Sequence, residues 1–331
     1  MKLSRLLVAP TILGLVAAGV VATATASDAA TSNYTLITAP DQGYAPIYAF
    51  INSATKSVDM TMYELQDTTA EQDLANDAAR GVTVRVILDT NLEKSNNTAA
   101  FNFLNAHGVQ AVWANTSFAA THQKTITVDG TDSAVMTGNL TSQFYATTRD
   151  FAVIDSNQID VNAIEKAFNA DFAHTAFKPT DGDNLVWSPT DSETQLLALI
   201  NGATSTLQVE NEEMGLPAVT TALENAAKRG VNVQVTMTNT ANEYASEFDA
   251  LTAAGAHVAT YTGETPIFIH AKVIVADFGT TAARVFLGSE NFSNASLNEN
   301  RELGLILKDS AVLTSTHATL AKDFTGATPW S

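Results

Sequence analysis

The stretch "THQKTITVDGTDSAVMTGNLTS" (residues 121–142) has a counterpart in "IHAKVIVADFGTTAARVFLGSENFS" (residues 269–293). Each stretch contains a histidine, a lysine two positions later and an aspartate five positions after the lysine. These residues are His122, Lys124 and Asp129 in the first stretch and His270, Lys272 and Asp277 in the second. Residues two apart in a strand share a face, so each histidine points to the same side as its lysine. Such a pair on a strand of Thr, Ile and Val indicates chemistry rather than packing.

The similarity between the two parts of the chain extends well beyond these stretches. "NSATKSVDMTMYEL", from residue 52, matches "NGATSTLQVENEEM", from residue 201. Within them Glu64 matches Glu213. Once a four-residue lengthening of the second motif's turn is allowed for, later residues match as well: Asn139 with Asn291, Arg149 with Arg301, and Asp150 with Glu302. The chain therefore contains an internal duplication, and the two copies should fold alike.

Each copy alternates strand and helix patterns. In the first copy we expect strands over 57–65, 82–89 and 149–155, and helices over 69–81, 99–108 and 161–177. This order predicts an α/β fold made of two α/β/α halves, related by a pseudo-twofold axis and with the active site at their interface. We place the first repeat at 27–180 and the second at 181–331. The Pro-, Gly- and Asp-rich residues 178–191 are the expected link.

The first 26 residues are typical of a secretory signal peptide. Lys2 and Arg5 precede an apolar run over 6–22, and Ala24 and Ala26 occupy the small positions of a cleavage site. An uncleaved membrane anchor is the alternative. No later stretch is long and apolar enough to span a bilayer, so we expect a secreted protein, extracellular or in the cell envelope, after cleavage near Ala26.

Charge and the absence of cysteine exclude several classes of protein. The chain has no cysteine, so it has no disulfide, thiol nucleophile or Cys metal site. Of its 17 Lys and Arg, the two in the predicted signal are removed, which leaves 15 basic against 35 acidic residues, a formal charge of −20. Such a surface repels polyanions, so we expect no stable nucleic-acid partner.

If the copies meet about a twofold axis, two histidines, two lysines and two asparagines share one pocket. The lysines would neutralise a phosphoryl group, and Asn139 and Asn291 would donate hydrogen bonds to its oxygens. One imidazole could attack phosphorus while the other protonates the leaving alcohol. No metal or other cofactor is needed for this scheme. Asp150 and Glu302, each on a strand next to the histidine of its own copy, should orient the rings.

These motifs resemble those of the phospholipase D superfamily, H-x-K-x4-D followed by G-S-x-N. The second copy continues with Gly288, Ser289 and Asn291, whereas the first has Met136, Thr137 and Asn139. Thr137 keeps the hydroxyl of the usual serine. Met136 replaces the usual glycine, and it would narrow the pocket or change its substrate.

The resemblance implies a phosphodiesterase that hydrolyses phospholipids, or transfers their phosphatidyl group to an alcohol, through a phosphohistidine. It favours His122 as nucleophile and His270 as acid. The expected partner is phospholipid at a membrane surface, and the protein is expected to be a monomer. A secreted nuclease of the same fold is one alternative. A catalytically weak phosphate- or lipid-binding protein is another, since Met136 could impair one half of the site.

Other matched residues allow two interpretations. Glu64 and Glu213 end their strands and either line the pocket or lie in a solvated turn. For Arg149 and Arg301, a role in structural ion pairs is the favoured interpretation. We expect Asp129 and Asp277 to hold the turn after the motif strand. Trp113, Phe118, Tyr145 and Phe268 flank the motifs and are more typical of core than of a lipid-binding rim.

Overall fold

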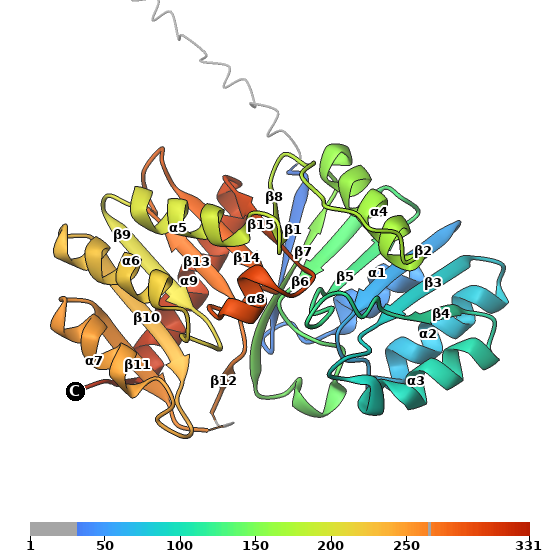
Figure 1. Cartoon of the computed structure of the whole chain (residues 1–331), viewed down its shortest axis with the longest axis horizontal. Helices are drawn as coiled ribbons and strands as arrows, with labels where there is room; N and C mark the ends of the chain where they lie inside the picture. Colours follow the sequence, from blue (N-terminus) through green and yellow to red (C-terminus); the bar gives the residue numbers. More distant parts are fainter. Residues whose placement is uncertain (1–31, 264–265) are drawn as a thin grey trace, which may run out of the picture. The chain divides into compact units, whose positions relative to one another are not determined.

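The structure is a computed structural model that describes residues 32–263 and 266–331. The predicted signal peptide, residues 1–26, lies outside the described residues, so export stays a prediction. Within the described part of the chain, no helix is long and apolar enough to cross a membrane. Two mixed α/β halves follow one another along the chain, the first blue to green and the second yellow to red in Figure 1.

Each half contains one sheet with the same order of equivalent strands. The first sheet consists, in spatial order, of β1 (Tyr34–Ala39), β7 (Thr148–Asp155), β6 (Asp132–Met136), β5 (Thr125–Val128), β2 (Ser57–Met62), β3 (Thr83–Leu88) and β4 (Gln110–Trp113). The second consists of β16 (Thr328–Pro329), β11 (His257–Tyr261), β10 (Asn232–Thr238), β9 (Thr206–Glu210), β13 (Val273–Ala276), β14 (Arg284–Gly288), β15 (Glu302–Leu307) and β8 (Leu185–Ser188). This confirms the predicted fold class and its duplication.

The helices also correspond between the halves. Those of the first half are α1 (Ala45–Asn52), α2 (Thr68–Ala79), α3 (Lys94–Ala106) and α4 (Gln158–Phe172), with a short 3₁₀ helix, η1 (Ser142–Phe144). Those of the second are α5 (Ser192–Gly202), α6 (Pro217–Lys228), α7 (Ala245–Ala253), α8 (Asn294–Asn298) and α9 (Ser310–Gly326). In chain order α1, α2, α3 and α4 take the places that α5, α6, α7 and α9 take in the second half.

The segment expected to link the repeats is partly structured. Residues 185–188 of the expected link form β8, which pairs antiparallel with β15, as β1 does with β7 in the first half. Its side chains are all buried, including Trp187. The Pro, Gly and Asp around it indicated a loop, but its apolar residues complete the edge of the second sheet.

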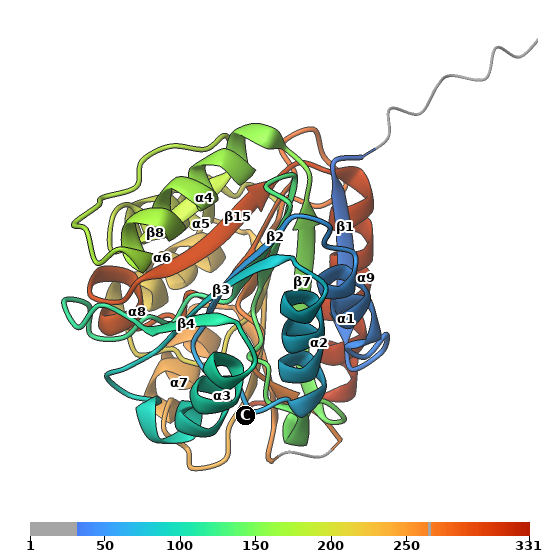
Figure 2. The same ribbon diagram turned by 90° about the vertical axis from the view of Figure 1, so that its right-hand side faces the viewer.

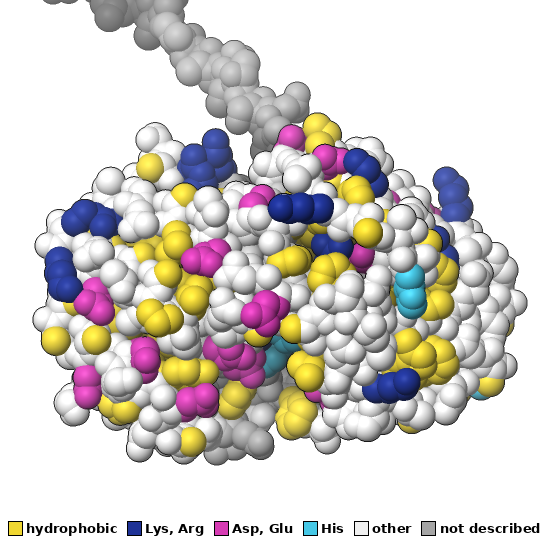
Figure 3. All heavy atoms as spheres, in the orientation of Figure 1, with side chains coloured by type: hydrophobic (Ala, Val, Ile, Leu, Met, Phe, Trp, Pro, Cys, Tyr) yellow, Lys and Arg dark blue, Asp and Glu magenta, His cyan; other side chains and the backbone are white. Residues whose placement is uncertain are grey.

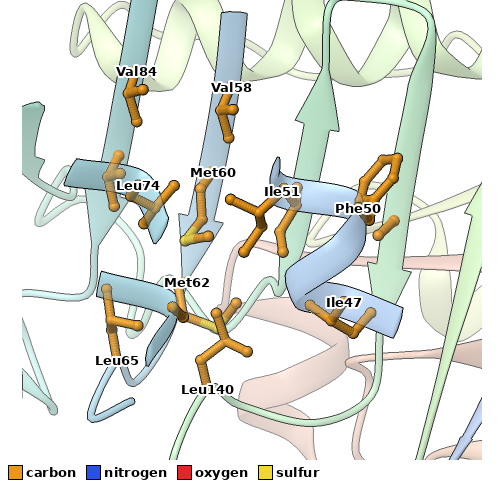
Figure 4. Close-up of a cluster of buried hydrophobic side chains, with 14 of the residues drawn as sticks. Ile47, Phe50, Ile51, Val58, Met60, Met62, Leu65, Leu74, Val84 and Leu140 are labelled. Carbon is orange, nitrogen blue, oxygen red and sulfur yellow. The ribbon is translucent and has the colours of Figure 1, made fainter. Parts of the chain in front are cut away.

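The core of the first half lies between its sheet and helices α1 to α3. Alternate residues of β2, among them Val58, Met60 and Met62, point to the same face and pack against Ile51 of α1 and Leu74 of α2 (Figure 4). Figure 2 turns this half toward the viewer, with α2 and α3 lying in front of the strands. The second half repeats the arrangement with α5, α6 and α7.

The inner faces of the two sheets share a further core with α4 and α9. Val153 of β7 and Leu305 of β15 belong to it, one from each half. Around it, buried arginines join the halves. Arg149 of the first half pairs with Asp323 of α9 at 2.5 Å, and Arg301 of the second donates to Asp171 of α4 at 3.0 Å. The two arginines thus make the expected structural ion pairs, each with a carboxylate of the opposite half, and Arg149 also pairs with Asp41 of its own half.

The motif aspartates lie at the far end of their strands from the histidines. Asp277 adopts a left-handed backbone (φ 52°) and accepts hydrogen bonds from the backbone N–H groups of Thr204, Ser205 and Thr206 at 2.9, 2.7 and 3.2 Å. Asp129 makes the equivalent contacts with residues 55–57. Each aspartate therefore holds the start of the neighbouring strand, β9 or β2, against the motif strand.

We predict that Asp277→Ala lowers the free energy of unfolding by about 2 kcal/mol, because it removes a charged acceptor from three part-buried N–H groups. Burial raises the pKa of Asp277, but these donors outweigh it and hold the pKa at about 2, below the ordinary 3.8. The folded pKa is depressed, so the contribution is complete above about pH 4 and is lost as pH falls toward 2. Urea unfolding at pH 7 and pH 3 measures it.

Asp181→Ala is the control, because Asp181 makes an exposed ion pair with Lys166. Equal stability of the Asp277 variant and the wild type at pH 7 would contradict the assigned role.

Candidate active site

The backbone at each motif histidine lies next to a strand of the other half. The backbone N–H of His122 donates to the carbonyl of Arg301 at 2.9 Å, next to a bridge between Thr121 and Arg301. In the same way, β12 (Phe268–Ile269) pairs in parallel with the start of β7, and the N–H of His270 donates to the carbonyl of Arg149 at 3.3 Å. The chain before each histidine is therefore held by the opposite half.

The same contacts between the halves determine which acid orients each histidine. His122 Nδ1 lies 2.8 Å from Glu302 Oε2, and His270 Nδ1 lies 2.9 Å from Asp150 Oδ1. The expectation that each acid serves the histidine of its own copy is therefore wrong. The strand that carries the acid is adjacent to the opposite histidine segment across the interface, which spacing within one copy could not show.

The two acids are themselves fixed by hydrogen bonds. Glu302 Oε1 accepts from Ser296 Oγ at 2.5 Å and from Asn300 Nδ2 at 2.9 Å. Asp150 Oδ1 accepts from Thr137 Oγ1 at 2.7 Å. With its remaining oxygen on the ring nitrogen, Glu302 has little freedom to turn, so the ring orientation of His122 is set in advance.

A cavity of about 420 Å³, the catalytic cavity, lies between the halves. Its lining includes both histidines, both asparagines, and Glu64 and Glu213. Tyr145 and Phe268 also line it, whereas Trp113 and Phe118 do not. Figure 3 shows a histidine where the halves meet, with acidic side chains gathered beside it on the second half. Asn139 Oδ1 and Asn291 Oδ1 are buried there and have no hydrogen-bond partner among the described residues.

The two lysines lie beneath the cavity rather than in its wall. Both are fully buried, and each Nζ donates to the carbonyl of its own histidine. Lys124 Nζ also lies 4.9 Å from the centre of the Tyr63 ring, whereas Lys272 Nζ lies 3.0 Å from Glu212 Oε2. A positive charge on either lysine would therefore act on an anion in the cavity without touching it.

Tyr63 and Glu212 occupy equivalent positions, and sequence reasoning missed both. The Tyr63 ring packs edge-on against His122, with centroids 4.5 Å apart. Glu212 Oε2 lies 3.4 Å from His270 Nε2 and 3.4 Å from Asn291 Nδ2. Tyr63 and Glu212 align when the copies are matched 149 positions apart, but they are not identical, so a match by identity does not mark them. A difference between the copies was the available signal.

The charges differ between the two halves of the site. Burial lowers the pKa of His122, against the opposing effect of Glu302. Burial, and next the charge of Lys272, lower the pKa of Lys124 to about 7. In the second half, burial would raise the pKa of Glu212, but His270 and Lys272 outweigh it and lower that pKa, so Glu212 is ionised.

Comparison with known proteins agrees with this arrangement. The family described as cardiolipin synthase, PLD-like domain matches residues 47–172 and 196–325. The chain belongs to the phospholipase D superfamily. The two matched segments fall one in each half, so each half is one phospholipase D-like unit.

Individual relatives cover different shares of the chain. Cardiolipin synthase A of Pseudomonas syringae pv. syringae (strain B728a) is 36% identical over 111 residues, 32% of this chain and 22% of that protein. The chain thus matches about a fifth of the length of this curated relative. Phosphatidylserine synthase of Haemophilus influenzae Rd KW20 superposes with a TM-score of 0.67 at 11% identity, over 90% of this chain and 87% of that one. Polyphosphate kinase of Porphyromonas gingivalis superposes with a TM-score of 0.68 at 14% identity, over 88% of this chain and 50% of that one. At these identities the two structures show the fold alone.

Met136, which replaces the usual glycine of the phospholipase D pattern, changes the packing of the first half. Met136 is buried in the core of the first half and is not among the residues that line the catalytic cavity. In the second half, Glu290 fills the space over Gly288, where a Cβ would collide with its carboxyl group. Burial, and next the charge of Glu302, raise the pKa of Glu290 well above its ordinary value, which favours the neutral acid. Met136 therefore does not narrow the site.

We predict that sulfate binds in the catalytic cavity and that its affinity falls above pH 7. Sulfate keeps its charge from pH 5 to 9, whereas Lys124, with a pKa of about 7, loses its charge as pH rises through that value. One coupled proton weakens binding by up to about tenfold per pH unit. Calorimetric titration at pH 6, 7, 8 and 9 measures this.

Lys124→Arg is the matched variant, because a guanidinium stays charged over this range. Its sulfate affinity should depend less on pH. An affinity of the wild type that stays constant from pH 6 to 9 would contradict the assignment.

Proposed function

We propose that the protein is a phosphodiesterase of phospholipase D type that acts on phospholipids through a phosphohistidine intermediate. The observation that carries the proposal is the crosswise pair of oriented histidines facing one cavity. His122 and His270 line the cavity, and a buried carboxylate fixes the Nδ1 of each ring. Nε2 of each ring is thereby turned away from its orienting acid and toward the cavity, where that of His270 also lies 3.4 Å from Glu212 Oε2.

The surroundings of the two rings support different roles. The lowered pKa of His122 favours the neutral imidazole, whose Nε2 lone pair can attack phosphorus. His270 has a carboxylate oxygen beside each ring nitrogen, Asp150 at Nδ1 and Glu212 at Nε2. That arrangement suits a ring protonated on both nitrogens, so His270 can hand a proton to the leaving alcohol oxygen. The same ring then takes a proton from the attacking water or alcohol.

A lipid suits the cavity better than a nucleic acid does. Phe144, 42% exposed, and the rings of Tyr44 and Tyr145 line the first-half side of the catalytic cavity. Glu212 and Glu213 line the other side. A polyanion would meet carboxylates and an acidic surface, whereas a single phosphodiester needs only the local field of the buried lysines.

Hydrolysis and transfer to an alcohol differ in the group that attacks the phosphohistidine. The similarity to a segment of cardiolipin synthase A supports transfer as well as hydrolysis. Both reactions use His270 in the same way, so we propose that the protein accepts water and primary alcohols in competition.

We predict that His122→Ala and His270→Ala each reduce phospholipid cleavage about a thousandfold or more, through loss of the nucleophile or the acid. With bis-p-nitrophenyl phosphate, whose leaving group needs no proton, His270→Ala should still form the covalent adduct. Rapid quench and mass spectrometry should then find it on His122.

His107→Ala is the control, because His107 is exposed and its Nδ1 contacts the carbonyl of Phe103. An adduct on another residue, or none in any variant, would refute the covalent scheme.

We predict that vesicles of phosphatidylcholine or phosphatidylethanolamine are cleaved well above plasmid or single-stranded DNA. The mature chain's excess of acidic residues opposes approach to DNA and to anionic bilayers within about 8 Å at physiological salt. A primary alcohol should divert product to the phosphatidyl alcohol. Rates measured side by side at moderate salt decide the matter, and faster cleavage of DNA would establish the nuclease alternative.

A further inference from the structure

A second cavity opens from the catalytic cavity on the side of the second half. This side cavity has a volume of about 380 Å³ and shares Glu212, Glu213 and Phe268 with the catalytic cavity. Its other lining residues include Glu243, Tyr244 and Asn239. A substrate whose phosphorus lies between the histidines can therefore extend one of its alcohol groups into the side cavity.

The side cavity carries unbalanced negative charge. No lysine or arginine lines it within residues 32–263 and 266–331. Burial, and also the charge of Glu212, raise the pKa of Glu213. Burial, followed by the charges of Glu213 and Glu243, raises the pKa of Tyr244. Three carboxylates and two aromatic rings surround a space large enough for a small organic group, and the combination suits an organic cation.

Asn239 is a second and independent indication of a ligand. This residue is 7% exposed and lines the side cavity. Its Nδ2 donates to Asn242 Oδ1 at 2.9 Å, but its Oδ1 has no hydrogen-bond partner in the part of the chain that the structure describes. A buried carbonyl oxygen without a donor is costly, and an N–H group of a ligand would satisfy it.

The position of Glu212 connects the side cavity to the reaction. Its side chain is 29% exposed, and its carboxylate lies 3.4 Å from His270 Nε2, the atom proposed to protonate the leaving alcohol. The equivalent position in the first half holds the uncharged Tyr63, beside His122. The three carboxylates that line the side cavity, Glu212, Glu213 and Glu243, thus all belong to the second half, which is the half proposed to receive the leaving group.

We propose that Glu212, together with Glu213 and Glu243, selects a leaving alcohol that carries a positively charged ammonium group, which binds in the side cavity. This inference rests on the proposed function, because it takes His270 as the acid. The phosphatidyl group stays on the side of His122 and Phe144, and the cationic alcohol leaves through the side cavity.

The test compares esters that differ in charge alone. Dihexanoyl phosphatidylcholine is compared with the ester of 3,3-dimethylbutanol, in which a tert-butyl group replaces trimethylammonium, and dihexanoyl phosphatidylethanolamine provides an ammonium with N–H groups. Below the micellar concentration no bilayer charge enters the comparison. We expect wild-type kcat/KM to favour at least one cationic ester over the neutral one by about tenfold or more, a difference of about 1.4 kcal/mol.

The carboxylate variants then locate the selectivity. Glu212→Gln and Glu243→Gln should each lower the ratio of cationic to neutral kcat/KM by about threefold or more. The ratio cancels any general loss of activity, because one enzyme acts on both esters. Glu243 is exposed, so its variant should fold even if the Glu212 variant does not. Glu247→Gln, on α7 but not among the residues that line the side cavity, is the matched control and should keep the wild-type ratio.

A wild-type ratio near one, or a ratio unchanged in both variants, would overturn the inference while the phosphodiesterase assignment stands. Failure of the wild type to cleave these esters and bis-p-nitrophenyl phosphate would instead remove the proposed function and this inference with it.

Discussion

Each half of this protein completes the active site of the other through the pairing of a histidine with a carboxylate across the interface. His122 reaches Glu302 and His270 reaches Asp150, and the backbone before each histidine bonds to the strand that carries its acid. Ion pairs from Arg149 to Asp323 and from Arg301 to Asp171 lie next to these contacts and have the same crosswise sense. Because the contacts that orient the rings are also contacts that join the halves, neither half holds an oriented histidine by itself.

A duplicated site that starts symmetric must become asymmetric to do acid–base chemistry, since one histidine has to be neutral when the other is protonated. Here a single pair of equivalent positions separates the two. Tyr63 gives His122 an aromatic edge and no charge, while Glu212 places a carboxylate against His270. Glu212 also offsets the charge of Lys272, so Lys124 is the buried cation without a carboxylate directly on its Nζ among the described contacts. The anionic phosphoryl group is therefore expected nearer to His122.

The sequence was sufficient for the repeat, the fold class and the paired histidines and asparagines that line the cavity, because periodicity and matched motifs are local properties. Four features escaped it for identifiable reasons. The exchange of Asp150 and Glu302 depends on contacts across the interface, which spacing within a copy does not encode. Strand β8 lies among Pro and Asp residues that indicated a loop. The histidine and lysine of each motif were expected to share a strand face, but both precede the strand, β5 or β13, and the lysines are buried outside the cavity lining. Glu212 escapes a comparison of the copies by identity, because its counterpart is Tyr63.

The burial of the lysines reconciles an acidic protein with an anionic substrate. The field of an exposed lysine would be screened by salt and offset by the surrounding carboxylates, which outnumber basic residues about two to one. Lys124 and Lys272 are fully buried, so in the proposed reaction they would act on a bound phosphoryl group through a medium of lower dielectric constant. At distances beyond the cavity the negative surface dominates, so a polyanion is repelled before any one of its phosphates can reach the histidines. Burial also disfavours the charged form of a lysine, and it lowers the pKa of Lys124 to about 7. Near neutral pH, Lys124 is therefore close to losing its proton when no anion is bound. Substrate binding and protonation of Lys124 must therefore favour each other.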